Sequence, residues 1–167
     1  TKLFFDVHMM VKDPERYVEE FQSCGADMIT VHAEACRDLA ETVKKIHETG
    51  ADAGVAVNPD TPLSAVTDVM DQVEMILIMS VYPGFGGQKY IPESTERIRT
   101  LRRMLDEKGL EHVHIQVDGG INRETIDEVL AAGANIIVAG SAVFGSNIEQ
   151  NVRELQEKIS SYSKKAE

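Results

Sequence analysis

The sequence predicts an α/β fold, a barrel of parallel strands in which each strand is followed by an outer helix. Short runs rich in Val, Ile and Met alternate with amphipathic segments, and within the runs apolar residues follow one another, as in strands buried on both faces. Glycine stands between helix end and next strand in three similar elements, Cys24-Gly25-Ala26-Asp27, Thr49-Gly50-Ala51-Asp52 and Ala132-Gly133-Ala134-Asn135. An open doubly wound sheet is the alternative.

Six strand-and-helix units follow one another along the chain. The expected strands are residues 3–8, 28–32, 53–57, 75–81, 113–117 and 136–139. The expected helices are residues 14–24, 38–49, 63–70, 93–108, 123–132 and 148–162. Local signals agree with these bounds: Pro14 and Pro62 suit first turns, Asn122 suits a cap, and Gly25, Gly50, Gly109 and Gly133 suit helix ends.

The organisation predicted is a single barrel domain over residues 1–167, because no linker or low-complexity tract divides the chain. Eight strands close such a barrel, usually within about 250 residues, so six units leave two unaccounted for. The chain also enters a strand-like run at Leu3 with no preceding cap or turn. We therefore expect the first two β/α units to be absent and the natural chain to be longer.

The charge and composition restrict the partners. A net charge of −11 over 167 residues disfavours sequence-independent binding to nucleic acid or to an anionic membrane. A small anionic ligand is still compatible, since backbone N–H groups can hold a phosphate. No run approaches the ~20 apolar residues of a membrane span. We expect a soluble cytoplasmic protein in which Cys24 and Cys36 are reduced.

Candidate reactive groups are sought at the carboxyl ends of the strands, where barrels place them. Asp6 and His8 point to the same side of the first strand, and a neutral His8 can bind a divalent metal; the alternative is a histidine satisfied by hydrogen bonds. Asp118, before Gly119 and Gly120, can be a metal ligand, a general base or both. The alternative there is an ordinary Asp-Gly turn.

Loops supply the other candidates. Residues 82–88 form a glycine-rich loop that can cover an anion, or be only a flexible connection. Gly140 and Ser141 follow the last strand and, with residues 118–120, predict a phosphate cradle. Met9 and Met79 are candidates for packing against a substrate, with core filling as the alternative. Supporting or structural roles are expected for the remaining polar residues considered: His32, Glu34, Asn58, His47, His112 and His114.

Taken together and in order, six motifs resemble the ribulose-phosphate 3-epimerase family. They are Asp6-Val7-His8-Met9-Met10-Val11, Val31-His32-Ala33-Glu34, Asn58-Pro59-Asp60-Thr61-Pro62, the stretch from Ser80 to Gln88, Val117-Asp118-Gly119-Gly120-Ile121 and Ala139-Gly140-Ser141. The resemblance implies an eight-stranded (β/α) barrel of the ribulose-phosphate-binding type, of which this chain carries strands 3 to 8.

The resemblance also implies the chemistry. The family uses a divalent metal, variously zinc, iron, manganese, cobalt or magnesium, held by two histidines and two aspartates, and only His8 and Asp118 match these ligands. Asp118 would be one of two acids that invert carbon 3 of D-ribulose 5-phosphate through an enediolate, giving D-xylulose 5-phosphate of the pentose phosphate pathway. The implied substrate and phosphate contacts are His8, Gly84, Phe85, Gly86, Gly87, Asp118, Gly119, Gly120, Gly140 and Ser141. Family members commonly form homo-oligomers.

Three alternatives are weighed against this interpretation. Decarboxylases and synthases of related phosphate barrels carry an Asp-x-Lys-x-x-Asp motif, whereas this chain has His8 in place of the lysine and Val11 in place of the second aspartate. An epimerase for a related ketose phosphate, such as allulose 6-phosphate, shares these motifs. The third alternative is an inactive fragment of a barrel.

Overall fold

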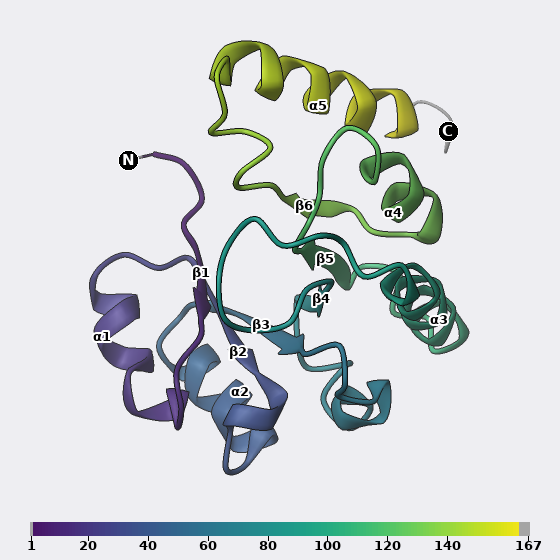
Figure 1. Cartoon of the computed structure of the whole chain (residues 1–167). Helices are drawn as coiled ribbons and strands as arrows, with labels where there is room; N and C mark the ends of the chain where they lie inside the picture. Colours follow the sequence, from purple (N-terminus) through teal and green to yellow (C-terminus); the bar gives the residue numbers. More distant parts are fainter. Residues whose placement is uncertain (1, 164–167) are drawn as a thin grey trace.

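A computed structural model describes residues 2–163 of the chain. Six parallel strands form one sheet in sequence order: β1 (Asp6–Met9), β2 (Met28–His32), β3 (Asp52–Val57), β4 (Met75–Met79), β5 (His114–Asp118) and β6 (Ile136–Val138). The sheet curls into part of a barrel (Figure 1), so that β1 approaches β5 although β2, β3 and β4 lie between them in the strand order. Across the interior, Asp6 Oδ2 accepts a hydrogen bond of 2.8 Å from Gln116 Nε2.

The α-helices of the described residues lie around the outside of the sheet (Figure 1). They are α1 (Val18–Ser23), α2 (Leu39–Glu48), α3 (Glu93–Glu107), α4 (Ile126–Ala132) and α5 (Ile148–Ser163). Short 3-10 turns occur at Pro14–Arg16, Ala33–Ala35 and Leu63–Val66. The α2 helix begins at a side-chain cap, because Asp38 Oδ1 accepts a hydrogen bond from the backbone N–H of Glu41 at 3.0 Å.

Apolar side chains fill both faces of the sheet, as the uninterrupted apolar runs predict. The larger cluster lies between the strands and the helices, where residues such as Ile76 and Ile115 meet Ile98 and Leu101 of α3. A smaller cluster of Ala56, Leu77 and Met79 belongs to the other face of β3 and β4. The inner strands β2, β3 and β4 are therefore buried on both sides, whereas β1 and β6 at the edges are partly exposed. Burial of the inner strands fixes their register and the direction of the side chains at their ends.

Two predicted elements differ most from the structure, and the predicted helix 14–24 is also divided into the 3-10 turn Pro14–Arg16 and α1. Residues 63–70 form tight turns, including the 3-10 turn Leu63–Val66, in place of an α-helix; each backbone bond spans three residues, as from Val69 N to Val66 O. Such turns bury Val66, Val69 and Met70 at the same spacing as a helix, which is why the pattern was ambiguous. Residues 3–5 lie outside β1, with Leu3 79% exposed, since pairing with β2 begins at Asp6.

The predicted helix ends at glycine are confirmed, but the N-cap residue of α4 is Thr125 in place of Asn122, and Pro62 precedes a 3-10 turn. Gly25, Gly50, Gly109 and Gly133 all have positive φ where helices or turns end. Asn122 Oδ1 accepts from the N–H groups of Glu124 and Thr125 just before α4. Cys24 and Cys36 are free. Within residues 2–163, no helix is long and apolar enough to cross a membrane.

Candidate active site

A cavity of about 320 Å³ opens at the carboxyl ends of the strands. It is bounded by residues that directly follow β1, β4, β5 and β6: Met10, Val81, the loop 82–88, Gly119, Gly120, Ile121, Gly140 and Ser141, together with Met79, Asp118 and Val138 of the strands themselves. Larger hollows of about 640 and 660 Å³ lie between α1 and α2 and at the amino ends of the strands. We place the site in the smaller cavity because parallel barrels hold their reacting groups at the carboxyl ends.

His8 and Asp118 face each other beside this cavity. His8 Nδ1 lies 3.7 Å from Asp118 Oδ2, and the two side chains are 15% and 26% exposed. They come from β1 and β5, and each lies two residues further along its strand than Asp6 and Gln116, which are hydrogen-bonded to each other. Two successive pairs thus join β1 to β5 across the barrel interior, and the outer pair is open to a ligand.

The pair fits part of a metal site. Zinc binds histidine nitrogen and carboxylate oxygen at about 2.0–2.2 Å, so two donors sharing one ion are at most about 4.2–4.3 Å apart, and the His8–Asp118 separation meets this limit. Among residues 2–163, no group of three or more His, Cys, Asp or Glu side chains is arranged to hold a metal. The described chain therefore offers two ligands of mixed nitrogen and oxygen character, a set that suits first-row divalent metals.

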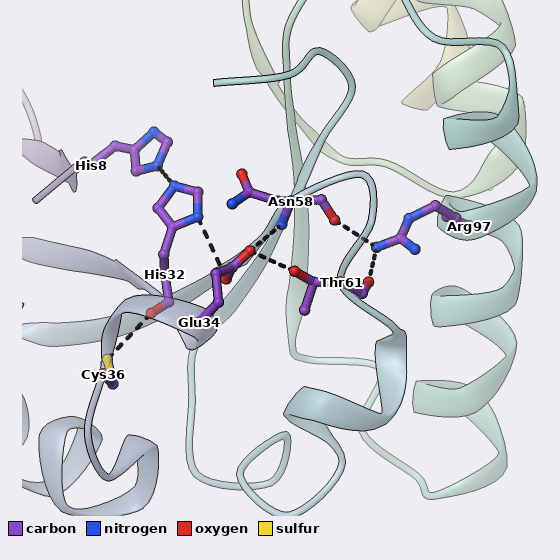
Figure 2. A network of polar contacts seen from close by, with 7 residues as sticks. All are labelled: His8, His32, Glu34, Cys36, Asn58, Thr61 and Arg97. Atoms are coloured by element: carbon purple, nitrogen blue, oxygen red, sulfur yellow. Dashed lines mark hydrogen bonds and ion pairs between the residues drawn. The ribbon is translucent and has the colours of Figure 1, made fainter. Parts of the chain in front are cut away.

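A second histidine lies directly against His8 (Figure 2). Nε2 of His8 and Nε2 of His32 are 2.8 Å apart, and the rings stack with centroids separated by 5.0 Å and planes inclined by 24°. The other nitrogen of His32, Nδ1, lies 3.7 Å from Glu34 Oε2; it is buried and has no hydrogen-bond partner. Sequence reasoning gave His32 and Glu34 only general supporting roles, so this contact was missed.

The Glu34 carboxylate interacts with Asn58 and Thr61 as well as with His32. Its Oε1 atom accepts hydrogen bonds from the N–H of Asn58 at 2.9 Å and from the Thr61 hydroxyl at 2.6 Å. Burial raises the pKa of this carboxyl, but the His32 ring 3.7 Å away and the hydrogen bonds from Thr61 and the backbone outweigh burial and lower the pKa to about 2. Arg97 of α3 extends the network by donating to the carbonyls of Asn58 and Thr61 (Figure 2).

The loop 82–88 is braced by one side chain. Gln88 Nε2 donates to the carbonyls of Tyr82 at 2.7 Å and Phe85 at 2.9 Å, closing the loop on itself. The Tyr82 hydroxyl donates to Asp60 Oδ1, while the Phe85 ring is 75% exposed. The predicted loop residues Gly84, Phe85, Gly86 and Gly87 all line the cavity.

The two glycines after β5 have a packing role as well as a place in the cavity wall. A Cβ added at Gly119 would lie 2.5 Å from the Val81 side chain, and one at Gly120 would lie 2.2 Å from the Tyr90 nitrogen. Both glycines also have positive φ. Gly140 has free space around it. The predicted cradle residues Gly119, Gly120, Gly140 and Ser141 are therefore brought together around one cavity, as expected from their positions after neighbouring strands.

The methionine prediction needs a correction. Met79 lines the cavity, but Met9 is only 3% exposed and is buried in the core beneath the helices. Side chains alternate along β1, so Met9 points away from the side occupied by His8. Met10, the residue after the strand, lines the cavity instead. His47, His112 and His114 lie together at the opposite end of the strands, away from His8 and Asp118, as predicted.

A curled sheet of parallel strands, with helices outside and polar loops at its carboxyl edge, defines an α/β protein of the (β/α)-barrel class. Solved structures agree on the fold. The 3-keto-L-gulonate-6-phosphate decarboxylase of Vibrio cholerae matches with a TM-score of 0.70 at 16% identity, over 94% of this chain and 72% of that one. A 3-hexulose-6-phosphate synthase from Salmonella typhimurium matches with a TM-score of 0.65 at 18% identity, over 89% and 68%. At such identities the likeness concerns the fold alone.

Sequence relatives identify the family. The ribulose-phosphate 3-epimerase family profile matches residues 1–144, and the chain belongs to this family. The Bacillus subtilis ribulose-phosphate 3-epimerase is 48% identical over 147 residues, covering 88% of this chain and 68% of the relative. The Synechocystis enzyme is 51% identical, with coverages of 87% and 64%, and the chloroplastic Arabidopsis thaliana enzyme is 49% identical, with 87% and 52%. The chain thus spans between about half and two thirds of these relatives' lengths.

Proposed function

We propose that the protein containing this chain is a metal-dependent epimerase that interconverts D-ribulose 5-phosphate and D-xylulose 5-phosphate at carbon 3. The observation that carries the proposal is the His8–Asp118 pair, at 3.7 Å, beside a cavity walled by glycine-rich loops. Membership of the epimerase family supports the same reaction. The activity concerns the whole protein, since the relatives named for it are longer than the matched region.

We propose further that β1 to β6 occupy positions 3 to 8 of an eight-stranded barrel forming one domain. The two edges of the sheet support this placement. Over residues 2–163, β1 pairs only with β2 and β6 only with β5, so the sheet has two edges. A closed barrel has none, and two added strands between β6 and β1 would complete it.

In this proposal Asp118 is the general acid or base for one face of the substrate. Its carboxylate takes the proton from carbon 3, and the electron pair left behind moves into the adjacent carbonyl to give an enediolate. A proton then returns to carbon 3 on the opposite face from a second acid, which we propose lies outside this chain. A divalent metal bound by His8 and Asp118 supplies positive charge beside the substrate oxygens.

The remaining cavity residues would bind the substrate's phosphate and exclude water. N–H groups near Gly119, Gly120 and Gly140, with the Ser141 hydroxyl, are neutral donors that suit an anion despite the net charge of −11. The loop 82–88 would cover the sugar, with Met79 and Met10 as its apolar floor and rim. Binding of the non-reacting phosphate then holds carbon 3 near Asp118.

The test is an epimerase assay on the purified full-length protein with ribulose 5-phosphate, with and without added divalent metal, and with allulose 6-phosphate as the competing substrate. Asp118→Asn keeps the shape of the side chain but removes its basicity, and loss of general base catalysis should lower kcat by about 10²–10⁴-fold. An active protein whose Asp118→Asn variant keeps full kcat would contradict the role given to Asp118. Preference for allulose 6-phosphate would transfer the proposal to that substrate.

A further inference from the structure

We propose that Glu34 and His32 are positioning residues that fix the tautomer of His8, so that the lone pair of His8 Nδ1 faces Asp118. The inference rests on the proposed function in one respect, since it treats His8 as a metal ligand. It assigns a role to two residues that are outside the ligand pair and do not line the cavity. Neither residue touches the reacting atoms; both act through His8.

The groups form one continuous chain, of which Figure 2 shows the part from Glu34 through His32 to His8. Glu34 Oε2 lies 3.7 Å from His32 Nδ1, His32 Nε2 lies 2.8 Å from His8 Nε2, and His8 Nδ1 lies 3.7 Å from Asp118 Oδ2. Each histidine thus faces a carboxylate with Nδ1 and the other histidine with Nε2. The near-parallel stacking of the two rings restricts their rotation.

When both imidazole rings are neutral, two arrangements of their protons are possible. A hydrogen bond between the two Nε2 atoms needs a single proton. Either His8 donates it, leaving His8 Nδ1 unprotonated and His32 Nδ1 protonated, or His32 donates it and the two Nδ1 positions are reversed. The two carboxylates compete, because each attracts an N–H toward itself.

The surroundings of Glu34 and His32 favour the first arrangement, in which His32 Nδ1 is protonated. Glu34 is ionised, with its pKa lowered to about 2, and its Oε1 atom is fixed by Asn58 and Thr61. His32 Nδ1 is buried, so an unprotonated nitrogen there would face a carboxylate with no donor to satisfy it. Asp118 lines the cavity and lies 3.7 Å from His8 Nδ1, so water or a cation beside Asp118 can satisfy the lone pair of that nitrogen.

The consequence is a pre-arranged pair of electron donors. His8 presents the Nδ1 lone pair and Asp118 presents a carboxylate oxygen to the same point, with no proton to be displaced from the imidazole. Ligand histidines commonly give their second nitrogen to a carboxylate, which fixes ring and tautomer. Here the carboxylate acts through an intervening imidazole.

The experiment is two-bond ¹H–¹⁵N NMR of the histidine rings in the metal-free full-length protein, where nitrogen shifts report which ring nitrogen is protonated. We expect His8 with Nε2–H and a bare Nδ1. In Glu34→Gln the amide oxygen can keep the bonds from Asn58 and Thr61, which turns the NH₂ group toward His32 Nδ1 and reverses the order. The variant should show His8 with Nδ1–H and bind Co²⁺ about 10–100-fold more weakly by titration.

Two controls separate positioning from general stability. Thr61→Val removes a hydrogen bond to Glu34 but keeps its charge, so it should lower stability and leave the His8 spectrum unchanged. Glu74→Gln removes the carboxylate 3.0 Å from His47 at the far end of the strands, a matched pair that should not affect His8. If Glu34→Gln does not fold, His32→Phe keeps the stacked ring but cannot accept the proton, and should give His8 a mixed tautomer.

Two outcomes overturn the inference: a protonated Nδ1 on His8 in the unmodified protein, or variants at Glu34 and His32 with unchanged His8 tautomer and Co²⁺ affinity. The tautomer is measured without substrate or metal. A protein with the expected proton order but no epimerase activity would therefore refute the proposed function while leaving this arrangement in place. An active epimerase in which His8 Nδ1 is protonated would refute this arrangement while supporting the proposed function.

Discussion

The hydroxyl of Ser80 lies 3.0 Å from the carbonyl oxygen of Asp118 and 2.7 Å from that of Gly119. Ser80 is fully buried, and its own N–H donates to the same Asp118 carbonyl at 2.9 Å. Ser80, just after β4, therefore holds the backbone of Asp118 in place by hydrogen bonds. The position of the candidate acid depends on this neighbour as well as on its own strand.

Replacing Ser80 by alanine should therefore affect both stability and activity. The substitution leaves buried carbonyls without one donor, which costs about 1–3 kcal/mol. We expect a lower urea midpoint and a lower kcat, because the Asp118 backbone is less firmly held. Ser64→Ala, at an exposed serine, is the control and should change stability by less than about 0.5 kcal/mol. Equal urea midpoints for the two variants would contradict this role.

Gln88→Glu tests the brace across the loop 82–88. A carboxylate cannot donate to the carbonyls of Tyr82 and Phe85, so the loop should open more often. The expected result is faster hydrogen exchange of the loop amides and a higher KM for the sugar phosphate. Gln72→Glu is a matched control, since the Gln72 side chain also donates to a carbonyl, that of Asp68, away from the cavity. Unchanged exchange in Gln88→Glu would rule out the brace.

Gly120 and Gly140 should differ sharply in their tolerance of alanine. Gly120 has a φ of +66°, and an added Cβ would lie 2.2 Å from the Tyr90 nitrogen, whereas Gly140 has open space around it. The left-handed backbone alone costs an alanine about 1–2 kcal/mol, and the clash adds to that. Thermal unfolding should show a clearly lower Tm for Gly120→Ala and a nearly unchanged Tm for Gly140→Ala. Similar losses in both would refute the packing role of Gly120.

The lowered pKa of Glu34 predicts a pH-dependent contribution to stability. Burial opposes ionisation, but the hydrogen bonds to Glu34 prevail and lower its pKa from 4.5 to about 2 in the folded protein. The group therefore stabilises the fold fully above about pH 4.5, and this contribution is lost as the pH falls toward 2. Urea unfolding of Glu34→Gln against the unmodified protein should show a difference that shrinks over this range.

A matched control for the pH experiment is Glu41→Gln. Glu41 is exposed on α2, where its carboxylate forms a surface ion pair with Lys44. Its effect on stability should stay small at every pH, because exposed pairs contribute little. A Glu34→Gln difference that does not vary between pH 2 and 5 would show that the carboxylate is not held as the structure indicates.

The sequence was sufficient for the parts of the fold that depend on local pattern. Buried parallel strands, helix ends at glycine and the place of Asp118 at the end of β5 all follow from residue type and spacing. The contact between His32 and His8 could not be predicted in this way, because it depends on the register of β1 and β2. His8 pairs with Thr30, and His32 lies two residues beyond Thr30 on the same face. The end of β1 was predicted one residue too early, at His8. Met9 still belongs to β1 and points into the core, whereas Met10 lies beyond the strand.

The double connection between β1 and β5 bears on how the site comes into being during folding. Asp6 and Gln116 are separated by 110 residues, and His8 and Asp118 by the same distance along the chain. Every strand between them must be aligned before either pair can meet, and closing so long a loop is slow. The His8–Asp118 pair is thus an end point of assembly: partly folded chains can hold helices and neighbouring strands, yet the two side chains meet only in molecules whose sheet has fully curled.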